Sequence, residues 1–181
     1  MMNKFFVILC ACVLLMAGCN QPLPPAPGGP TTTITDATGV LGGFMGTACM
    51  LSKTYIMIDS YWGFVSPFLP AVVKGNALPV LNMFLPALKA YDQAVITWYE
   101  TKTEPGNWVK VKDDVMKIWA DIQPLIEKIK TAIADNKKST DKALFAVRDL
   151  SKETQAKPFT SCPIDQLKEY ALTLDGLKPL T

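Results

Sequence analysis

The residue types in this chain of 181 residues limit the chemistry that it can perform. It contains no histidine. Ser-His-Asp and Cys-His nucleophiles, histidine-ligated zinc and histidine general bases are therefore excluded within one subunit. There is no Gly-Lys-Ser/Thr phosphate loop, and the glycines of GVLGGFMG follow a polar linker, not the strand that a dinucleotide fingerprint requires. We expect no enzymatic activity, no metal site and no cofactor.

Acidic residues offer two further places for acid or base chemistry. Asp113 and Asp114 are adjacent, but two acids in a first helical turn usually interact with the helix dipole. Asp59 lies in an aromatic segment, and an acid among apolar neighbours can have a raised pKa and a proton-linked role. We prefer the alternative that Asp59 caps a helix starting near Tyr61 or faces water.

The N-terminal residues have the layout of a secretory signal. Lys4 precedes an apolar run, Phe5 to Leu15, that is too short to span a bilayer. The run ends in Met16-Ala17-Gly18-Cys19, which resembles the lipobox of bacterial lipoproteins. The resemblance implies that a signal peptidase removes residues 1–18 and that Cys19 carries a diacylglyceryl group. Two or three acyl chains on Cys19 would hold the protein permanently at a membrane.

The residues after Cys19 predict where the protein is held and how far it extends. An Asp after the cysteine retains enterobacterial lipoproteins in the inner membrane, so Asn20 favours the outer membrane, facing the periplasm. The segment NQPLPPAPGGPTTTIT has five prolines and no charge, which favours a disordered linker over residues 19–35. Sixteen residues of polyproline II would reach roughly 50 Å. The folded part is then a single domain, residues 36–181.

The remaining cysteines predict a disulfide. Cys10 and Cys12 would leave with the signal peptide and Cys19 would take the lipid, which leaves Cys49 and Cys162. In an oxidising compartment an isolated pair of this kind is most simply a disulfide, and the alternative is two buried free thiols. The mature chain has 17 basic and 16 acidic residues, since Lys4 is lost from the 18 basic residues of the whole chain. A net charge of +1 gives no nucleic-acid footprint.

Apolar spacing predicts an all-α fold, an antiparallel bundle of about four to five helices. Apolar residues recur at steps of three and four in two long segments joined by the turn TKTEPGN, and so short a connection makes the two helices antiparallel neighbours. The first seam comprises Leu81, Leu85, Leu88, Tyr91, Val95 and Trp98; the second comprises Trp108, Val111, Val115, Ile118, Ile122, Leu125 and Ile129. Asn107 is the expected N-cap of the second helix.

Two shorter helices are predicted nearer the C-terminus. Ser139 or Thr140 can cap the first of them, and Pro163 suits the first turn of the second. Their apolar seams comprise Leu144, Val147 and Leu150, and then Ile164, Leu167, Ala171 and Leu174.

The segment from Asp36 to Val73 is unusual because it has only three charged residues and two overlapping glycine pairs, Gly39/Gly43 and Gly42/Gly46. Glycine at every fourth position lets two helices approach closely, in water or in lipid. We prefer a buried central helix, and membrane insertion of residues 37–73 is the alternative.

Two classes of function fit these features. The first is a non-enzymatic structural or protein-interaction module, attached to the membrane through Cys19, that docks an envelope protein. Its expected contact residues are Tyr61, Trp62, Phe64 and Phe68, provided that they are exposed and are not part of the core. The alternative is a periplasmic carrier that binds an apolar ligand between its helices.

Overall fold

The computed structural model describes residues 34–160 and 162–181. This part of the chain folds into five α-helices and one 3-10 helix and contains no strand, which confirms the predicted all-α bundle. The elements are α2 (Ile34–Val65), η1 (Ser66–Phe68), α3 (Ala71–Thr101), α4 (Trp108–Asp135), α5 (Asp141–Thr154) and α6 (Ile164–Gly176). The predicted signal peptide, Cys19 and residues 20–33 of the predicted linker lie outside the described residues.

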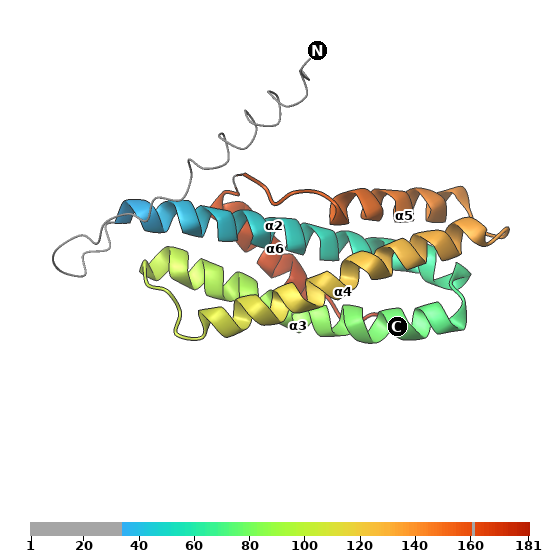
Figure 1. Cartoon of the computed structure of the whole chain (residues 1–181), viewed down its shortest axis with the longest axis horizontal. Helices are drawn as coiled ribbons and strands as arrows, with labels where there is room; N and C mark the ends of the chain where they lie inside the picture. The colour runs from blue at the N-terminus through green and yellow to red at the C-terminus, as the bar shows by residue number, and fades with distance from the viewer. Residues whose placement is uncertain (1–33, 161) are drawn as a thin grey trace, which may run out of the picture. The chain divides into compact units, whose positions relative to one another are not determined.

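Helix α2 is the central element of the bundle. It packs against α3, α5 and α6, while α3 and α4 form the predicted antiparallel pair. Helix α5 packs on α2 and α4, and α3 packs on α2, α4 and α6. Figure 1 shows the consequence: α5 and α3 lie at opposite edges of the bundle, with α2 and α4 between them. The segment around the glycine pairs is thus part of a packed central helix, as the sequence predicted.

The predicted seams form the core. Every seam residue of α3 is buried, and the α4 seam is buried except for Val111 and Ile118, which are half-buried. Helix α3 begins ten residues before its first predicted seam residue, Leu81, and continues through Pro79 and Pro86. A proline normally interrupts a helix because it lacks an N–H and clashes with the preceding turn. Both prolines lie on the exposed side of α3, where water can satisfy the carbonyl groups that they leave free.

The helix ends match the predictions only in part. Thr140 caps α5, because its side chain accepts a hydrogen bond from the backbone N–H of Ala143. Asn107 precedes α4 as predicted, but its side chain makes no capping hydrogen bond. The prediction that Asp113 and Asp114 interact with the helix dipole from the first turn was wrong. Both residues lie in the second turn of α4, too far from its N-terminus for that interaction, and both are exposed.

Aromatic side chains fill the core where the first half of α2 meets the end of α3 and the start of α4. The ring centroid of Phe44 lies 4.5 Å from that of Trp108 and 5.8 Å from that of Trp98. Tyr91 also stands against Trp108, with 5.3 Å between the ring centroids. Large aromatic surfaces buried in this way contribute strongly to stability. They secure the glycine-rich half of α2, which contributes Phe44 to the cluster.

Candidate functional site

The aromatic residues predicted as a contact surface have different surroundings in the structure. Trp62 is only 7% exposed, and its Nε1 donates a hydrogen bond to the backbone oxygen of Thr181 over 2.9 Å. Phe68 is half-buried in η1. Phe64 is 47% exposed, and Tyr61 is half-buried beside it. The surface available for contact is therefore narrower than the sequence predicted and is centred on Phe64.

Phe64 and Tyr61 form one wall of a shallow groove, and α5 supplies the other. The groove has a volume of about 420 Å³ and is lined by Tyr61, Phe64, Asp141, Lys142, Phe145 and Ala146. Phe145 is 64% exposed, so two phenylalanine rings from different helices face solvent at one place. We call these six residues the α2–α5 groove.

Sequence reasoning missed Phe145. The α5 seam passes through Val147 and Leu150. Phe145 lies on the opposite side of the helix, where the residues one turn before and one turn after it are charged. A large apolar residue on the polar side of an amphipathic helix was the available signal.

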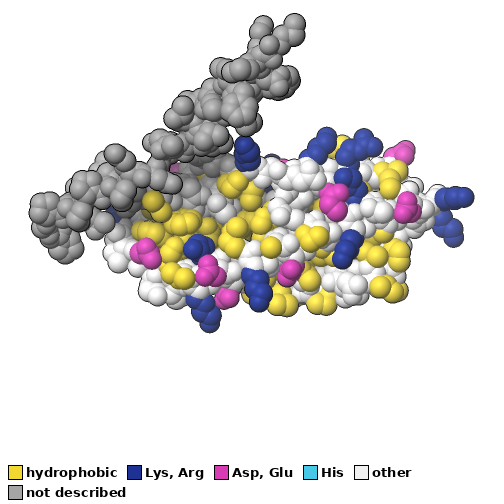
Figure 2. Space-filling model, in the orientation of Figure 1, with side chains coloured by type: hydrophobic (Ala, Val, Ile, Leu, Met, Phe, Trp, Pro, Cys, Tyr) yellow, Lys and Arg dark blue, Asp and Glu magenta, His cyan; other side chains and the backbone are white. Residues whose placement is uncertain are grey.

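Charged side chains hold the residues of the groove in place and determine the electric charge around it. The hydroxyl of Tyr61 donates a hydrogen bond to Asp149 Oδ2 over 3.0 Å. Burial raises the pKa of Tyr61, and this hydrogen bond raises it further. The Nζ atom of Lys142 lies 5.8 Å from the centre of the Phe64 ring, within cation–π range. Figure 2 shows further Lys and Arg side chains at the neighbouring end of the bundle, where α4 turns into α5. Lys137 and Lys138 are exposed in that connection.

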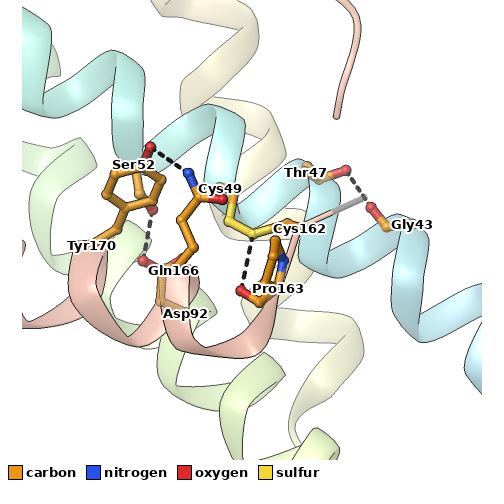
Figure 3. Close-up of a disulfide and its surroundings, with 9 residues drawn as sticks. All are labelled: Gly43, Thr47, Cys49, Ser52, Asp92, Cys162, Pro163, Gln166 and Tyr170. Atoms are coloured by element: carbon orange, nitrogen blue, oxygen red, sulfur yellow. Dashed lines mark hydrogen bonds between the residues drawn. A yellow bond between two sulfur atoms is a disulfide. The ribbon is translucent and has the colours of Figure 1, made fainter. Parts of the chain in front are cut away.

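The predicted partners Cys49 and Cys162 are joined. Their Cα atoms are 6.4 Å apart across a sequence separation of 113 residues, and both side chains are buried (Figure 3). Because Cys162 lies two residues before α6, the bond ties the start of that helix to the middle of α2. It helps to define how the bundle closes, and it places both cysteine sulfurs of the described residues in the core.

A buried acid lies one turn beyond the disulfide. Asp92 of α3 is fully buried and accepts a hydrogen bond over 2.7 Å from the hydroxyl of Ser52 on α2 (Figure 3). Its second oxygen, Oδ1, has no partner among the described residues. Burial raises the pKa of Asp92 to about 8; the Ser52 hydrogen bond opposes this effect and the negative charge of Asp175 on α6 adds to it. The raised pKa favours the protonated form of Asp92, and the sequence pattern gave no sign of this because the residue sits inside an apolar seam.

The chain between α5 and α6 crosses α2 at Gly46. A side-chain carbon at position 46 would collide with the backbone oxygen of Phe159, so only glycine lets the two backbones come this close. Lys53 of α2 forms a 3.0 Å ion pair with Glu153 at the end of α5, just before this segment, and its Nζ atom lies 5.6 Å from the centre of the Phe159 ring within it. Of the predicted glycine pairs, the position that has a packing role is Gly46.

Two other surface hollows are of similar size, about 450 Å³ and about 350 Å³, and neither is lined by an aromatic side chain. One enclosed space has a volume of about 10 Å³, enough for one water at most. Its lining residues are Ile58, Tyr61, Trp62, Val65, Leu81, Ile126, Ile129 and Leu150. Among the residues that the structure describes, no three Cys, Asp or Glu side chains come together to hold a metal ion. Asp59 lies within α2 and does not cap a helix near Tyr61; it is half-buried, and burial raises its pKa.

Compared with known proteins, the chain matches no family model, no curated protein and no solved structure. Its function has to be argued from its own residues.

Proposed function

We propose that this protein is a lipid-anchored, non-enzymatic interaction module of the cell envelope, and that the α2–α5 groove is where an envelope protein docks. The observation that carries the proposal is the pair Phe64 and Phe145, which present two exposed rings from two helices around one groove. Exposed aromatic residues that meet in a concave surface are the usual anchors of protein interfaces. The anchor on Cys19, facing the periplasm from the outer membrane, follows from the lipobox resemblance.

The chemistry of the groove indicates what kind of partner segment fits. Lys142 stands against the Phe64 ring, and Lys137 and Lys138 lie near the groove, whereas Asp149 is engaged by Tyr61. Asp141 also lines the groove, so three lysines stand against two acids, Asp141 and the hydrogen-bonded Asp149, which leaves a small excess of positive charge around an apolar groove. A protein segment that offers an apolar side chain flanked by carboxylates complements both features.

The anchor is tested separately from the groove. Changing Cys19 to Ser should abolish acyl labelling and leave uncleaved precursor, because the thiol is the acceptor of the lipid. Metabolic labelling with a fatty acid followed by gel analysis gives the answer. Unchanged acylation in this variant would remove the basis for the proposed location.

Docking is tested by capture of partners from the native envelope. The lipidated protein is purified after mild crosslinking, and the proteins that it brings down are identified and quantified for wild type, Phe64→Ala and Phe145→Ala. Removing an interface anchor typically costs about 2 kcal/mol or more, so each variant should reduce capture of a specific partner by roughly thirtyfold. Leu172→Ala is the matched control, because Leu172 is also exposed but lies on α6.

The proposal fails if the Phe64 and Phe145 variants capture the same proteins as the Leu172 variant. It also fails if either groove variant loses capture only because it unfolds, which thermal melts of the same samples show. The carrier alternative stays a prediction, and the small enclosed space near Trp62 gives it no support.

A further inference from the structure

Helix α6 has an exposed side that the docking proposal does not use. Leu172 lies at the middle of this side and is 74% exposed. Glu169 lies one turn before Leu172, Asp175 one turn after it and Asp165 two turns before it, and all three acids are exposed. Residues at these spacings share one side of a helix. We call these four residues the α6 ridge, which presents one apolar side chain surrounded by carboxylates.

The carboxylates of the α6 ridge keep most of their negative charge available. Asp175 approaches Lys89 of α3 at 3.8 Å, but 69% of its side chain is still exposed. The single basic residue of α6, Lys168, forms a 2.6 Å ion pair with Glu100 of α3. Because this lysine already has a partner, it does not neutralise the acids beside Leu172.

The outer side of α5 has the opposite charge. Phe145 is 64% exposed there, with exposed basic residues one turn before it, one turn after it and two turns after it. These basic residues are Lys142, Arg148 and Lys152, and none of them forms an ion pair with a described residue. Asp149 and Glu153 of the same helix are engaged by Tyr61 and Lys53 of α2. We call Phe145 and the three basic residues the α5 ridge.

The two ridges match when α5 and α6 run antiparallel with Leu172 beside Phe145. Each residue raises an α-helix by about 1.5 Å, so residues at equal and opposite separations from these two come to the same level. Steps of three and seven residues separate the charges from the central residue on both helices. The pairs that come level are Arg148 with Glu169, Lys142 with Asp175, and Lys152 with Asp165.

The same register brings no two like charges level. Asp149 of α5 comes level with Lys168 of α6, and Asp141 comes level with Gly176. Pairing α5 with a second α5, or α6 with a second α6, would instead place like charges side by side around the central residue, which is unfavourable. Charge complementarity therefore selects α6 as the helix that fits α5.

We propose that α6 of one copy of this chain docks on α5 of a second copy, with Leu172 beside Phe145 at the edge of the α2–α5 groove. The α6 ridge is an apolar side chain flanked by carboxylates, which is the chemistry that the groove complements. Phe145 and Leu172 are both exposed in the single chain, so α6 does not fill the groove of its own copy. Two copies anchored through Cys19 in one membrane would meet at a high effective concentration, so a weak contact is sufficient.

This proposal goes beyond the docking of another envelope protein and does not depend on it. A second copy and another protein would use the same groove, so the two would compete for it. Self-association can be measured with the purified chain alone.

The test uses the mature, disulfide-bonded chain with Cys19→Ser, so that no acyl chain causes aggregation. Sedimentation velocity at rising protein concentration and low salt measures self-association. Arg148→Glu reverses one charge of the α5 ridge, and Glu169→Arg reverses the charge that comes level with it. Lys117→Glu is the matched control, because Lys117 is also an exposed basic residue but lies on α4.

We expect the parent protein to associate and to dissociate as salt screens the exposed ion pairs. Arg148→Glu and Glu169→Arg should each weaken self-association about tenfold, since each places like charges together, and Lys117→Glu should leave it unchanged. An equimolar mixture of the two reversed variants should associate as strongly as the parent, because every contact in a mixed pair again joins opposite charges. Thermal melts exclude unfolding as the cause of any loss.

A parent protein that stays monomeric at every concentration would overturn the proposal. It would also be overturned by a mixture that associates no better than either reversed variant alone, or by an equal loss in the Lys117 variant. In the envelope capture, copies of the chain itself are counted apart from other proteins, because Leu172→Ala is a control only for the latter. Capture of other proteins through Phe64 is thus judged separately, and failure of self-association leaves it intact.

Discussion

The two halves of α2 are built from different residues and are held in different ways. The first half, through Lys53, is rich in glycine and is fixed by a disulfide, by an ion pair and by a chain segment that crosses it at Gly46. The second half, from Tyr55 to Val65, carries large aromatic residues and is fixed by packing, with Phe64 left exposed. In the first half, a covalent bond and a close backbone contact add to the packing of buried side chains such as Leu41, Met45 and Leu51.

This difference shows which half can change without loss of the fold. In the first half the disulfide, the ion pair and the crossing at Gly46 close the bundle, so substitutions at these positions should act on stability. In the second half Trp62 and Phe64 are two positions apart and face the core and the solvent respectively. The predictions below test this division, from the largest expected effect to the smallest.

The largest effect should come from removing the disulfide. Replacing Cys49 and Cys162 together by Ala should lower the free energy of unfolding by about 4 to 5 kcal/mol in the loop-entropy model for so long a loop. Urea unfolding of the double variant and of wild type, with and without reductant, measures the loss. If wild type unfolds at the same urea concentration in both conditions, the bond does not hold the first half of α2 in place.

The second prediction compares neighbouring aromatic residues in the other half. Trp62→Ala should cost about 3 to 5 kcal/mol, because it leaves a cavity and removes the hydrogen bond to Thr181. Phe64→Ala should change stability by about 0.5 kcal/mol or less, as expected for a surface position. Thermal and urea unfolding of the two variants decide the matter. A similar large loss in both would mean that Phe64 belongs to the core and not to a contact surface.

The third prediction concerns pH and the buried Asp92. Its pKa is raised to about 8 by burial, so between about pH 4 and pH 8 the folded state holds a proton that the unfolded state has released. This contribution is complete below about pH 4 and is lost as the pH rises to about 8, with a slope of up to about 1.4 kcal/mol per pH unit. Urea unfolding across this range should show stability falling as pH rises.

Asp92→Asn keeps an acceptor for Ser52 and cannot ionise, so it should flatten the dependence on pH whatever its effect on stability at one pH. Ser52→Ala is the companion variant. It removes the hydrogen bond that lowers the pKa of Asp92 and should extend the loss of stability to higher pH without changing its slope. An Asp92→Asn variant with the full slope of wild type would show that another group controls the response.

The smallest effect distinguishes the glycines of the first half. Gly46→Ala should destabilise by about 1 to 3 kcal/mol, because the new methyl group collides with the Phe159 carbonyl and displaces the crossing segment. Gly43→Ala meets no atom of the described residues within 4 Å and should stabilise by up to about 1 kcal/mol through helix propensity. Equal effects at the two positions would show that the crossing segment does not constrain α2.

Much of the fold was predictable because it depends on local patterns. The seams of α3 and α4, the cap at Thr140 and the pairing of Cys49 with Cys162 all follow from spacing or from counting. The early start of α3 was missed because prolines normally end a helix, and here they lie on its outer side. Which aromatic residue is buried could not be predicted, because it depends on contacts with residues more than 80 positions away.

The candidate site was predictable only from its α2 side. Tyr61 and Phe64 stood out in an aromatic segment, but Phe145 comes from a helix whose place beside α2 is set by tertiary packing. Asp92 was missed for the same reason, since its partner Ser52 is 40 positions away. The burial of Trp62 removed one predicted contact residue from the surface.

One crosslinking experiment tests the central claim, that a protein docks in the α2–α5 groove. A photoreactive phenylalanine analogue is placed at Phe64 or at Met83 in the lipidated protein, in living cells, with Val109 as the exposed control position. We expect a discrete, sequenceable protein adduct from position 64 and no protein adduct from positions 83 and 109. Protein adducts from position 83 with none from position 64 would contradict the account.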